Sequence, residues 1–441
     1  MAAAVATAAA LSVTAGASAD WPSYGHDLFN SRNAGPTAPS PRMARELAPA
    51  WSYRVPTGGI TGTPVVAGGT LVTTSSKCVV YALDAATGRP EWKRRLKSLG
   101  CGYTPGSPAI DGGVVYVAMG SSGGKGPQVV AMTLDHGAIL WHAFLDPTQG
   151  FADTYASPTV WNGSVYAGIS GIVEEEGLAK GLHLRGAVTA LDAATGALRW
   201  RWYTVPPSFD GGPVWSTAAV DPATGVLFAG TGNAYHRPAA PTTDSIVALS
   251  ATGGDYLGSY SAVPNDVFLD RHSGNGPDAD FGSSPNLFAA PDGRPLVGDL
   301  AKNGTYWALD RQTMAPVWSR PTGTVHVGEA IASTASDGAR IYGQNDKGQV
   351  WALGTDGHRL WSTHRNGAAN FSPLAVGNGV LYSIEYRGFL DVRLASTGRR
   401  LARLQLPAAS WGGVSVSGHT VFAATGTDLA SRGWIVAFRP R

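Results

Sequence analysis

Apolar and polar positions follow one pattern along most of the chain, in which short apolar runs alternate with turns rich in glycine. Residues 63–73 and 107–117 each hold two apolar runs with Gly-Gly between them, which is typical of a β-hairpin. In residues 82–92 an apolar run ends at Asp, a Thr-Gly turn reverses the chain, and the next run carries Trp. Glycine suits the positive-φ position of such a turn, and Asp and Thr can bond its backbone. We therefore expect short strands joined by tight turns.

The segment with Asp, the Thr-Gly turn and Trp is an internal repeat. Copies of it start at residues 82, 131, 190, 248, 308, 352 and 392, of which those at 248 and 392 are weaker. A four-stranded propeller blade has a period of about 40–45 residues, so the longer intervals predict extra loops on the middle blades. With a last unit closed by residues 435–438, the pattern predicts an all-β, eight-bladed propeller that forms a single domain over residues 20–441. Ring closure would pair the first and last strands, and each Trp would face the neighbouring blade.

Composition and charge narrow the possible partners. The chain has 441 residues, 58 of them Gly, and 33 Lys and Arg against 31 Asp and Glu, for a net charge of +2. Such a balance gives no attraction to phosphate backbones, so nucleic acid is not an expected partner. After the N-terminus, no apolar run reaches the roughly 18 residues of a membrane span.

Residues 1–19 are almost entirely small and apolar and end in Ala17-Ser18-Ala19, the pattern that a signal peptidase accepts. We expect a signal peptide over residues 1–19, and therefore a secreted or periplasmic protein, although an Ala-rich tail is the alternative. In such a compartment Cys78 and Cys101, the two cysteines of the chain, could form a disulfide.

The repeat Ala-Leu-Asp-Ala-Ala-Thr-Gly-x-x-x-Trp resembles the tryptophan-docking motif of the quinoprotein alcohol dehydrogenases. The opening residues 21–32 are also similar to the start of that family. Residues 185–192 and 280–285 are most similar to the polyvinyl-alcohol dehydrogenase branch, here without a haem domain. The resemblance implies an eight-bladed propeller that binds pyrroloquinoline quinone (PQQ) and a metal ion, Ca²⁺ or a lanthanide, and oxidises an alcohol to a carbonyl.

The same resemblance implies residues that hold the cofactor and the metal. Trp215 matches the indole beneath the quinone, although it could instead be one more blade-packing Trp. Asn233, in Gly230-Thr-Gly-Asn233, matches the calcium-ligand asparagine, and Asn is also a common turn former. The carboxylate ligand should follow Ser170 and Gly171, which border the cofactor, in the run Glu174-Glu175-Glu176. Glu174 fits this position best and Glu175 nearly as well, and a solvated acidic loop is the alternative.

The catalytic base of the family is an aspartate that matches residues 278–282. Either Asp280 or Asp278 fills this role; if Asp278 is the base, Asp280 becomes a further metal ligand, as in lanthanide-using relatives. A base beside a metal stays ionised despite burial. Lys302 matches the cation that bonds the quinone oxygens and would stabilise developing negative charge, whereas a solvated turn lysine is the alternative.

Some features depart from the family pattern and keep a second hypothesis open. Where larger dehydrogenases carry two adjacent cysteines and a nearby arginine, this chain has Cys101-Gly-Tyr. The family also has a threonine that contacts the quinone carboxylate and precedes the position of Glu174. The matching residues here, 155–158, are Tyr-Ala-Ser-Pro and lack it. No Cys-x-x-Cys-His occurs, so electrons would pass to an external acceptor such as a cytochrome c. The alternative function is a cofactor-free propeller that acts as an extracytoplasmic binding or assembly scaffold.

Overall fold

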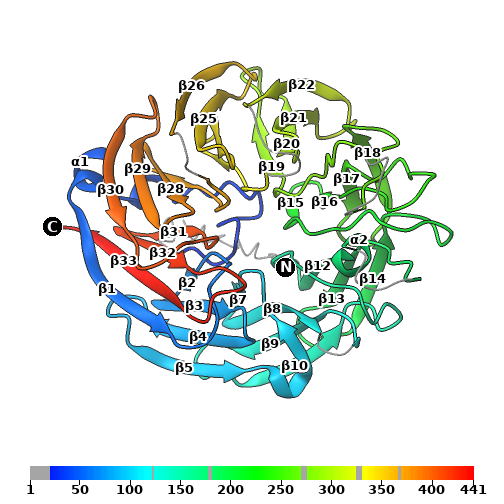
Figure 1. Ribbon diagram of the computed structural model, residues 1–441, viewed down its shortest axis with the longest axis horizontal. Helices are drawn as coiled ribbons and strands as arrows, with labels where there is room; N and C mark the ends of the chain where they lie inside the picture. Colours follow the sequence, from blue (N-terminus) through cyan, green and yellow to red (C-terminus); the bar gives the residue numbers. More distant parts are fainter. Residues whose placement is uncertain (1–19, 122–123, 177–180, 270–275, 324–329, 366–368) are drawn as a thin grey trace, which may run out of the picture.

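The computed structural model describes residues 20–121, 124–176, 181–269, 276–323, 330–365 and 369–441. The predicted signal peptide, residues 1–19, lies outside this part. Within the described residues, strands form eight sheets that follow one another around a central axis (Figure 1). Seven sheets have four strands, and one has a fifth short strand. The predicted all-β, eight-bladed propeller is confirmed.

Each of the first four blades runs from an innermost strand to an outermost strand. Their strands are β2 (Val65–Ala67), β3 (Thr70–Ser75), β4 (Val79–Asp84) and β5 (Pro90–Arg95), then β6 (Cys101–Tyr103), β7 (Ala109–Asp111), β8 (Val114–Ser121), β9 (Gln128–Thr133) and β10 (Ile139–Phe144), then β11 (Thr159–Trp161), β12 (Ser164–Ile169), β13 (Ala187–Asp192) and β14 (Leu198–Tyr203), then β15 (Ala219–Asp221), β16 (Val226–Gly230), β17 (Ser245–Ser250) and β18 (Tyr256–Ser261).

The next three blades repeat this order, and the last blade is built from both ends of the chain. Their strands are β19 (Asn286–Ala289), β20 (Pro295–Leu300), β21 (Thr305–Asp310) and β22 (Pro316–Pro321), then β23 (Ala335–Ser336), β24 (Arg340–Gln344), β25 (Gln349–Gly354) and β26 (Arg359–His364), then β27 (Ala375–Gly377), β28 (Val380–Glu385), β29 (Phe389–Leu394) and β30 (Arg400–Gln405), and finally β31 (Val414–Ser417), β32 (Thr420–Thr425), β33 (Gly433–Pro440) and β1 (Leu47–Val55).

Ring closure follows from the pairing of the two ends. β1 pairs antiparallel with β33 from Leu47 opposite Pro440 to Val55 opposite Gly433. Figure 1 shows the blue β1 beside the red β33. The predicted sharing of one sheet by the first and last strands is therefore confirmed, and it pairs the inner edge of β1.

Helical segments are few and short in the described chain. They are η1 (Gly35–Thr37), α1 (Pro41–Arg45), η2 (Lys97–Leu99) and α2 (Ile172–Glu175). None of the described helices is long and apolar enough to cross a membrane.

The core lies between blades rather than in one central mass. Tyr166 and Val188 of one blade pack with Leu227 and Val247 of the next, and similar clusters fill the other blade interfaces. The middle strands are buried along their length because both of their faces pack against a neighbour, whereas outermost strands such as β5 alternate between exposed and half-buried positions. This arrangement explains the apolar runs in the sequence.

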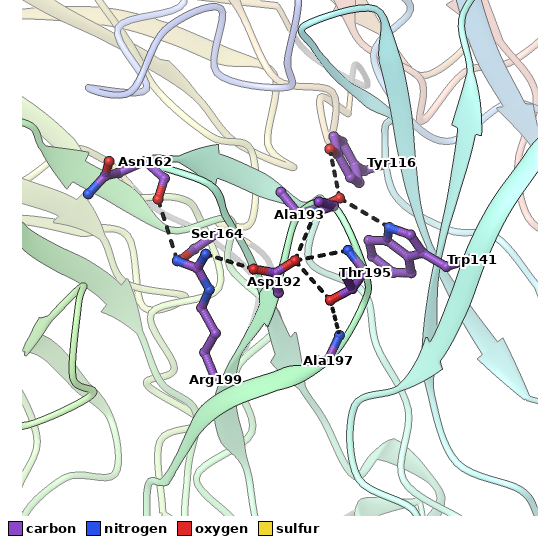
Figure 2. Close-up of polar contacts among 10 residues, drawn as sticks. Tyr116, Trp141, Asn162, Ser164, Asp192, Ala193, Thr195, Ala197 and Arg199 are labelled. Carbon is purple, nitrogen blue, oxygen red and sulfur yellow. Dashed lines mark hydrogen bonds and ion pairs between the residues drawn. The ribbon is translucent and has the colours of Figure 1, made fainter.

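The repeated turn contacts the preceding blade, as Figure 2 shows for the turn between β13 and β14. Between β13 and β14, the Asp192 carboxylate accepts the Thr195 N–H at 2.9 Å. The carbonyl of Ala193 accepts the indole N–H of Trp141, on the preceding blade, at 3.0 Å. Gly196 adopts φ +74°, and a Cβ there would lie 2.5 Å from the Trp141 ring. The turn thus needs its Asp, Thr and Gly, as the sequence predicts.

Residues 21–34 run past the innermost strands of several blades and tie them together. Their carbonyl groups accept backbone N–H groups from six of these strands: Trp21 from Val66, Pro22 from Ile110, Leu28 from Val220, Phe29 from Leu287, Ser31 from Ser336 and Arg32 from Val376. The similarity of residues 21–32 to the family start therefore has a structural reason.

Candidate functional site

A cavity of about 570 Å³ lies among the loops that precede the innermost strands. Aromatic side chains make up much of its wall: Tyr103, Tyr155, Trp215, Phe371 and Trp411. Trp215 lies in the loop between β14 and β15. A Cβ at Gly282 would lie 1.9 Å from the Trp215 ring, so glycine is required there for the indole to keep its place.

Asp280 is the centre of a buried polar cluster beside Trp215. It accepts the Trp215 indole N–H at 3.2 Å and the backbone N–H of Asn233 at 2.7 Å. The Lys302 ammonium lies 3.1 Å from Asp280 and 2.9 Å from Asp278. Five positions singled out in the sequence, namely Trp215, Asn233, Asp278, Asp280 and Lys302, therefore meet at one place. A Cβ at Gly232 would lie 2.9 Å from the Asp280 carboxylate, so glycine before Asn233 allows this approach.

The cluster holds more negative than positive charge. Burial and the nearby Asp280 raise the pKa of Asp278 to about 6, against the opposing effect of Lys302. Burial and Asp280 also raise the pKa of Asp244 well above its usual range. Burial by itself would lower the pKa of Lys302. The opposite effect of Asp280, Asp278 and Glu175 is larger, so the pKa of Lys302 is raised above its usual value. One lysine thus faces several buried carboxylates, an arrangement that favours an additional cation.

Asn233 offers an oxygen suited to such a cation. Its amide nitrogen donates to the carbonyls of Phe268 at 2.8 Å and Ala234 at 3.1 Å, which fixes the orientation of the side chain. Its Oδ1 is buried and has no hydrogen-bond donor among the described residues. Amide and carboxylate oxygens are the ligands that Ca²⁺ prefers, and the trivalent lanthanides share this preference for hard donors. The residues present therefore fit a hard metal ion.

The two candidate glutamates lie on α2 and interact with different sets of residues. The Glu174 carboxylate accepts the Leu184 N–H at 2.5 Å. Burial and the nearby Asp210 raise the pKa of Glu174 to about 7. Glu175 raises the pKa of Lys302, and both glutamates raise the pKa of Tyr235. Glu175 is therefore the glutamate that acts on the lysine of the Asp280 cluster.

Ser170 and Gly171 hold the start of this segment. The backbone of Ser170 exchanges two hydrogen bonds with Asp153, each 2.8 Å long. A Cβ on Gly171 would lie 3.2 Å from the Tyr235 hydroxyl. In the part of the chain that the structure describes, neither residue hydrogen-bonds to Asp280, Asn233 or Lys302.

Cys78 and Cys101 form a disulfide with an S–S distance of 2.12 Å. Cys101 begins β6, and the other two residues of this strand, Gly102 and Tyr103, line the cavity.

Several polar residues near the site escaped the sequence analysis. Tyr235 is fully buried, and its pKa is raised by burial and by Glu175 and Asp280. Asp244 shares the Asp280 environment. His183 and His236 both contact Asp210. Tyr235 and His236 lie two and three positions after Asn233 in sequence, which is the one signal that could have found them.

Comparisons with known proteins agree with this geometry. Eight blades closed by the chain ends, with carboxylates gathered beside a tryptophan near the axis, define the class of propellers that resemble PQQ-dependent alcohol dehydrogenases. The chain belongs to the family described as outer membrane protein assembly factor BamB, whose profile matches residues 44–319 and 185–438.

The chain is 28% identical over 389 residues to the polyvinylalcohol dehydrogenase of Sphingopyxis sp. (strain 113P3), an alignment that covers 77% of this chain and 58% of that protein. It spans about half the length of the curated relatives it matches. These relatives make the chain a homologue of PQQ-dependent alcohol dehydrogenases.

Two solved structures share its fold. The quinohemoprotein alcohol dehydrogenase of Comamonas testosteroni superimposes with a TM-score of 0.78 at 20% identity, covering 97% of this chain and 81% of the other. A europium-containing methanol dehydrogenase superimposes with a TM-score of 0.79 at 17% identity, covering 96% and 98%.

Proposed function

We propose that this protein is a quinoprotein dehydrogenase that oxidises an alcohol to a carbonyl. The observation that carries the proposal is the contact of Asp280 with Trp215, Asn233 and Lys302 at one buried point. When bound with its metal ion, PQQ supplies a two-electron oxidant for an alcohol. The Trp215 ring would hold the quinone, and Asn233 Oδ1, Glu175 and the Asp278 carboxylate would hold the metal.

The chain's own residues have distinct tasks in the reaction. Asp280 is the base that accepts the hydroxyl proton of the alcohol on a carboxylate oxygen. Lys302, 3.1 Å from that carboxylate, stabilises negative charge that develops beside it. The hydrogen bonds from Trp215 and Asn233 keep the Asp280 carboxylate in one orientation, so the base needs little reorganisation during the reaction.

The substrate class follows from the cavity and the relatives. The aromatic wall of the cavity suits an alcohol with an apolar chain. We infer a secondary alcohol, with polyvinyl alcohol as the first candidate because a relative bears that name. Electrons would leave to a separate carrier such as a cytochrome c. The disulfide supports an oxidising, extracytoplasmic location.

The decisive experiment titrates the purified protein with PQQ in the presence of Ca²⁺ or a light lanthanide and follows the thermal midpoint and the quinone absorbance. We expect saturable stabilisation that depends on the metal, because a ligand that binds only the folded state raises its stability. Asn233→Ala should lose it, since the substitution removes the unpaired Oδ1. Asn378→Ala is the matched control, because its amide donates to the Ala38 carbonyl, far from the cluster in sequence. Saturating stabilisation would then justify a dye-linked alcohol screen.

A cofactor-free scaffold is the second candidate function. The description of the matching family favours it, since that description names an assembly factor. Against it stands the buried carboxylate cluster, because ionised groups inside a protein are costly without a compensating partner. If neither metal supports quinone binding by wild type, the dehydrogenase proposal is wrong, and protein partners become the object of the search.

A further inference from the structure

A second polar cluster includes Glu174, which lies on α2. It consists of Glu174, His183, Asp210 and His236, and we call it the histidine cluster. One side-chain ligand atom from each residue lies within 4.8 Å of the other three. The four residues come from α2, from the loops before β13 and after β14, and from the loop between β16 and β17. Two neighbouring blades therefore supply the cluster.

Asp210 is the residue on which the histidines converge. Its Oδ2 lies 2.9 Å from His183 Nδ1 and 2.7 Å from His236 Nδ1. The Asp210 side chain is 5% exposed, whereas those of His183 and His236 are 73% and 55% exposed. The cluster thus combines a buried carboxylate with two imidazoles that ions in solution can reach.

Glu174 adds an oxygen that the protein leaves unpaired. The residue is 5% exposed, and its Oε2 is held by the Leu184 N–H. Its Oε1 is buried and has no hydrogen-bond partner among the described residues. A buried carboxylate oxygen without a partner costs free energy, and here it belongs to a residue grouped with a second carboxylate and two imidazoles.

We propose that the histidine cluster binds a first-row divalent transition metal, with Zn²⁺ as the expected ion. Two imidazole nitrogens and two carboxylate oxygens form a mixed N and O donor set, which suits Zn²⁺ rather than Ca²⁺. Tetrahedral Zn²⁺ with bonds of about 2.0–2.1 Å separates its ligand atoms by about 3.3 Å. The exposed histidines can move the short distance needed, because their side chains are free on the solvent side.

The role of this metal is to fix α2. Glu174 and Glu175 are adjacent, so a metal that anchors Glu174 also holds the backbone that presents Glu175 to Lys302 and Tyr235. The two clusters nevertheless differ in their donors. Among the described residues, the Asp280 cluster offers carboxylate and amide oxygens to a metal, whereas the histidine cluster also offers two imidazoles. The proposal therefore stands whether or not the chain binds a quinone.

The test uses the full protein, stripped of metals with a chelator and kept in Ca²⁺ so that oxygen-only sites are occupied. Co²⁺ is added as a spectroscopic probe and Zn²⁺ in a separate calorimetric titration. We expect one equivalent of each ion to bind, with a visible Co²⁺ absorption typical of four-coordination that includes nitrogen.

The double variant His183→Ala/His236→Ala should bind Zn²⁺ at least tenfold more weakly and lose the Co²⁺ band. Its fold should persist, because both side chains are exposed. His358→Ala is the matched control, since His358 is an exposed histidine that pairs with one aspartate, Asp356, at 3.1 Å. Glu174→Gln, which keeps the side-chain size, should also weaken binding.

Absence of a Co²⁺ band in wild type, or a Zn²⁺ affinity that the double variant leaves unchanged, would overturn the proposal. The quinone titration plays no part in these measurements. Failure of the proposed dehydrogenase function would therefore leave the metal result intact, and the reverse also holds.

Discussion

At the scale of single residues, Asp280 and Asp278 have different surroundings although they are two positions apart. Asp280 is bound by an indole N–H and a backbone N–H, whereas Asp278 contacts Lys302 at the edge of the cluster. Only Asp280 is therefore held by groups on more than one side. This difference favours Asp280 as the base and Asp278 as a metal ligand.

Asp280→Asn separates these roles. The amide oxygen can still accept the Asn233 N–H, so we expect quinone binding to persist. Dye-linked alcohol oxidation should fall by about 10²–10⁴-fold, because the base is lost. Steady-state kinetics and quinone absorbance check both expectations. If Asp278→Asn causes the larger loss in kcat while quinone binding remains, the assignment of the base is reversed.

A second prediction at this scale concerns Asp299, which is fully buried beneath the site. Burial raises its pKa to about 7, against the hydrogen bonds from Ser283 and Leu300. Between pH 4 and 7 the folded state therefore holds a proton that the unfolded state releases, and stability falls as pH rises through this range. We expect a loss on the order of 4 kcal/mol at most, given about 1.4 kcal/mol for each pKa unit.

Asp299→Asn should flatten this decline, because the amide cannot titrate. Thermal midpoints measured from pH 4 to 8 test it. Asp292→Asn is the control, since Asp292 is an exposed surface carboxylate paired with Arg294. A wild-type and an Asp299→Asn profile of equal slope would contradict the prediction.

At the scale of elements, the repeated turn determines how neighbouring blades meet. Similar indole bonds to the next blade recur at Trp51, Trp92, Trp200, Trp318 and Trp361, whose N–H groups donate to carbonyls at 2.7–3.2 Å. Each of these bonds lies beside the glycine of the turn. The glycine thus serves both the turn and the packing of the indole.

Gly196→Ala tests this double requirement. The substitution should cost roughly 1–2 kcal/mol for a side chain at positive φ, and a further 1–3 kcal/mol, about the penalty of overpacking, because the Trp141 ring must move. Gly113→Ala is the matched control, because Gly113 has φ +80° and open space around its Cβ position. Thermal midpoints should fall more for Gly196→Ala than for Gly113→Ala. Equal losses would mean that the indole contact adds nothing.

At the scale of the whole molecule, the segment from residue 21 to 34 and the terminal strands hold the ring together. Arg32 is fully buried, and burial lowers its pKa to about 10. Its guanidinium donates to the carbonyls of Tyr24, Leu374 and Val414, which belong to distant parts of the chain. A single side chain thus links the N-terminal segment to two late blades.

Arg32→Met keeps an unbranched stem but removes the guanidinium, which leaves these carbonyls without their donor. We expect a loss of about 3 kcal/mol or more, because several buried acceptors become unsatisfied. The exposed Arg199, paired with Asp192 at 2.8 Å, provides the control Arg199→Met, which should cost less than about 1 kcal/mol. Comparable thermal midpoints for the two variants would rule out the bracing role of Arg32.

The sequence by itself determined the architecture of this protein. The strands, the turn with Asp, Thr and Gly, the number of blades and the closure of the ring follow from local chemistry that repeats along the chain, so the same inference could be made several times. It also singled out Trp215, Asn233, Asp280 and Lys302, which meet in the fold.

The division of the polar residues between two clusters depends on the tertiary fold. Successive side chains on a helix point about 100° apart, so the sequence could not tell that Glu174 groups with His183 while Glu175 acts on Lys302. His183, Asp210 and His236 come from separate loops with no common spacing. Their meeting depends on where two blades place those loops, and long-range contacts of this kind leave no periodic signal in a single sequence.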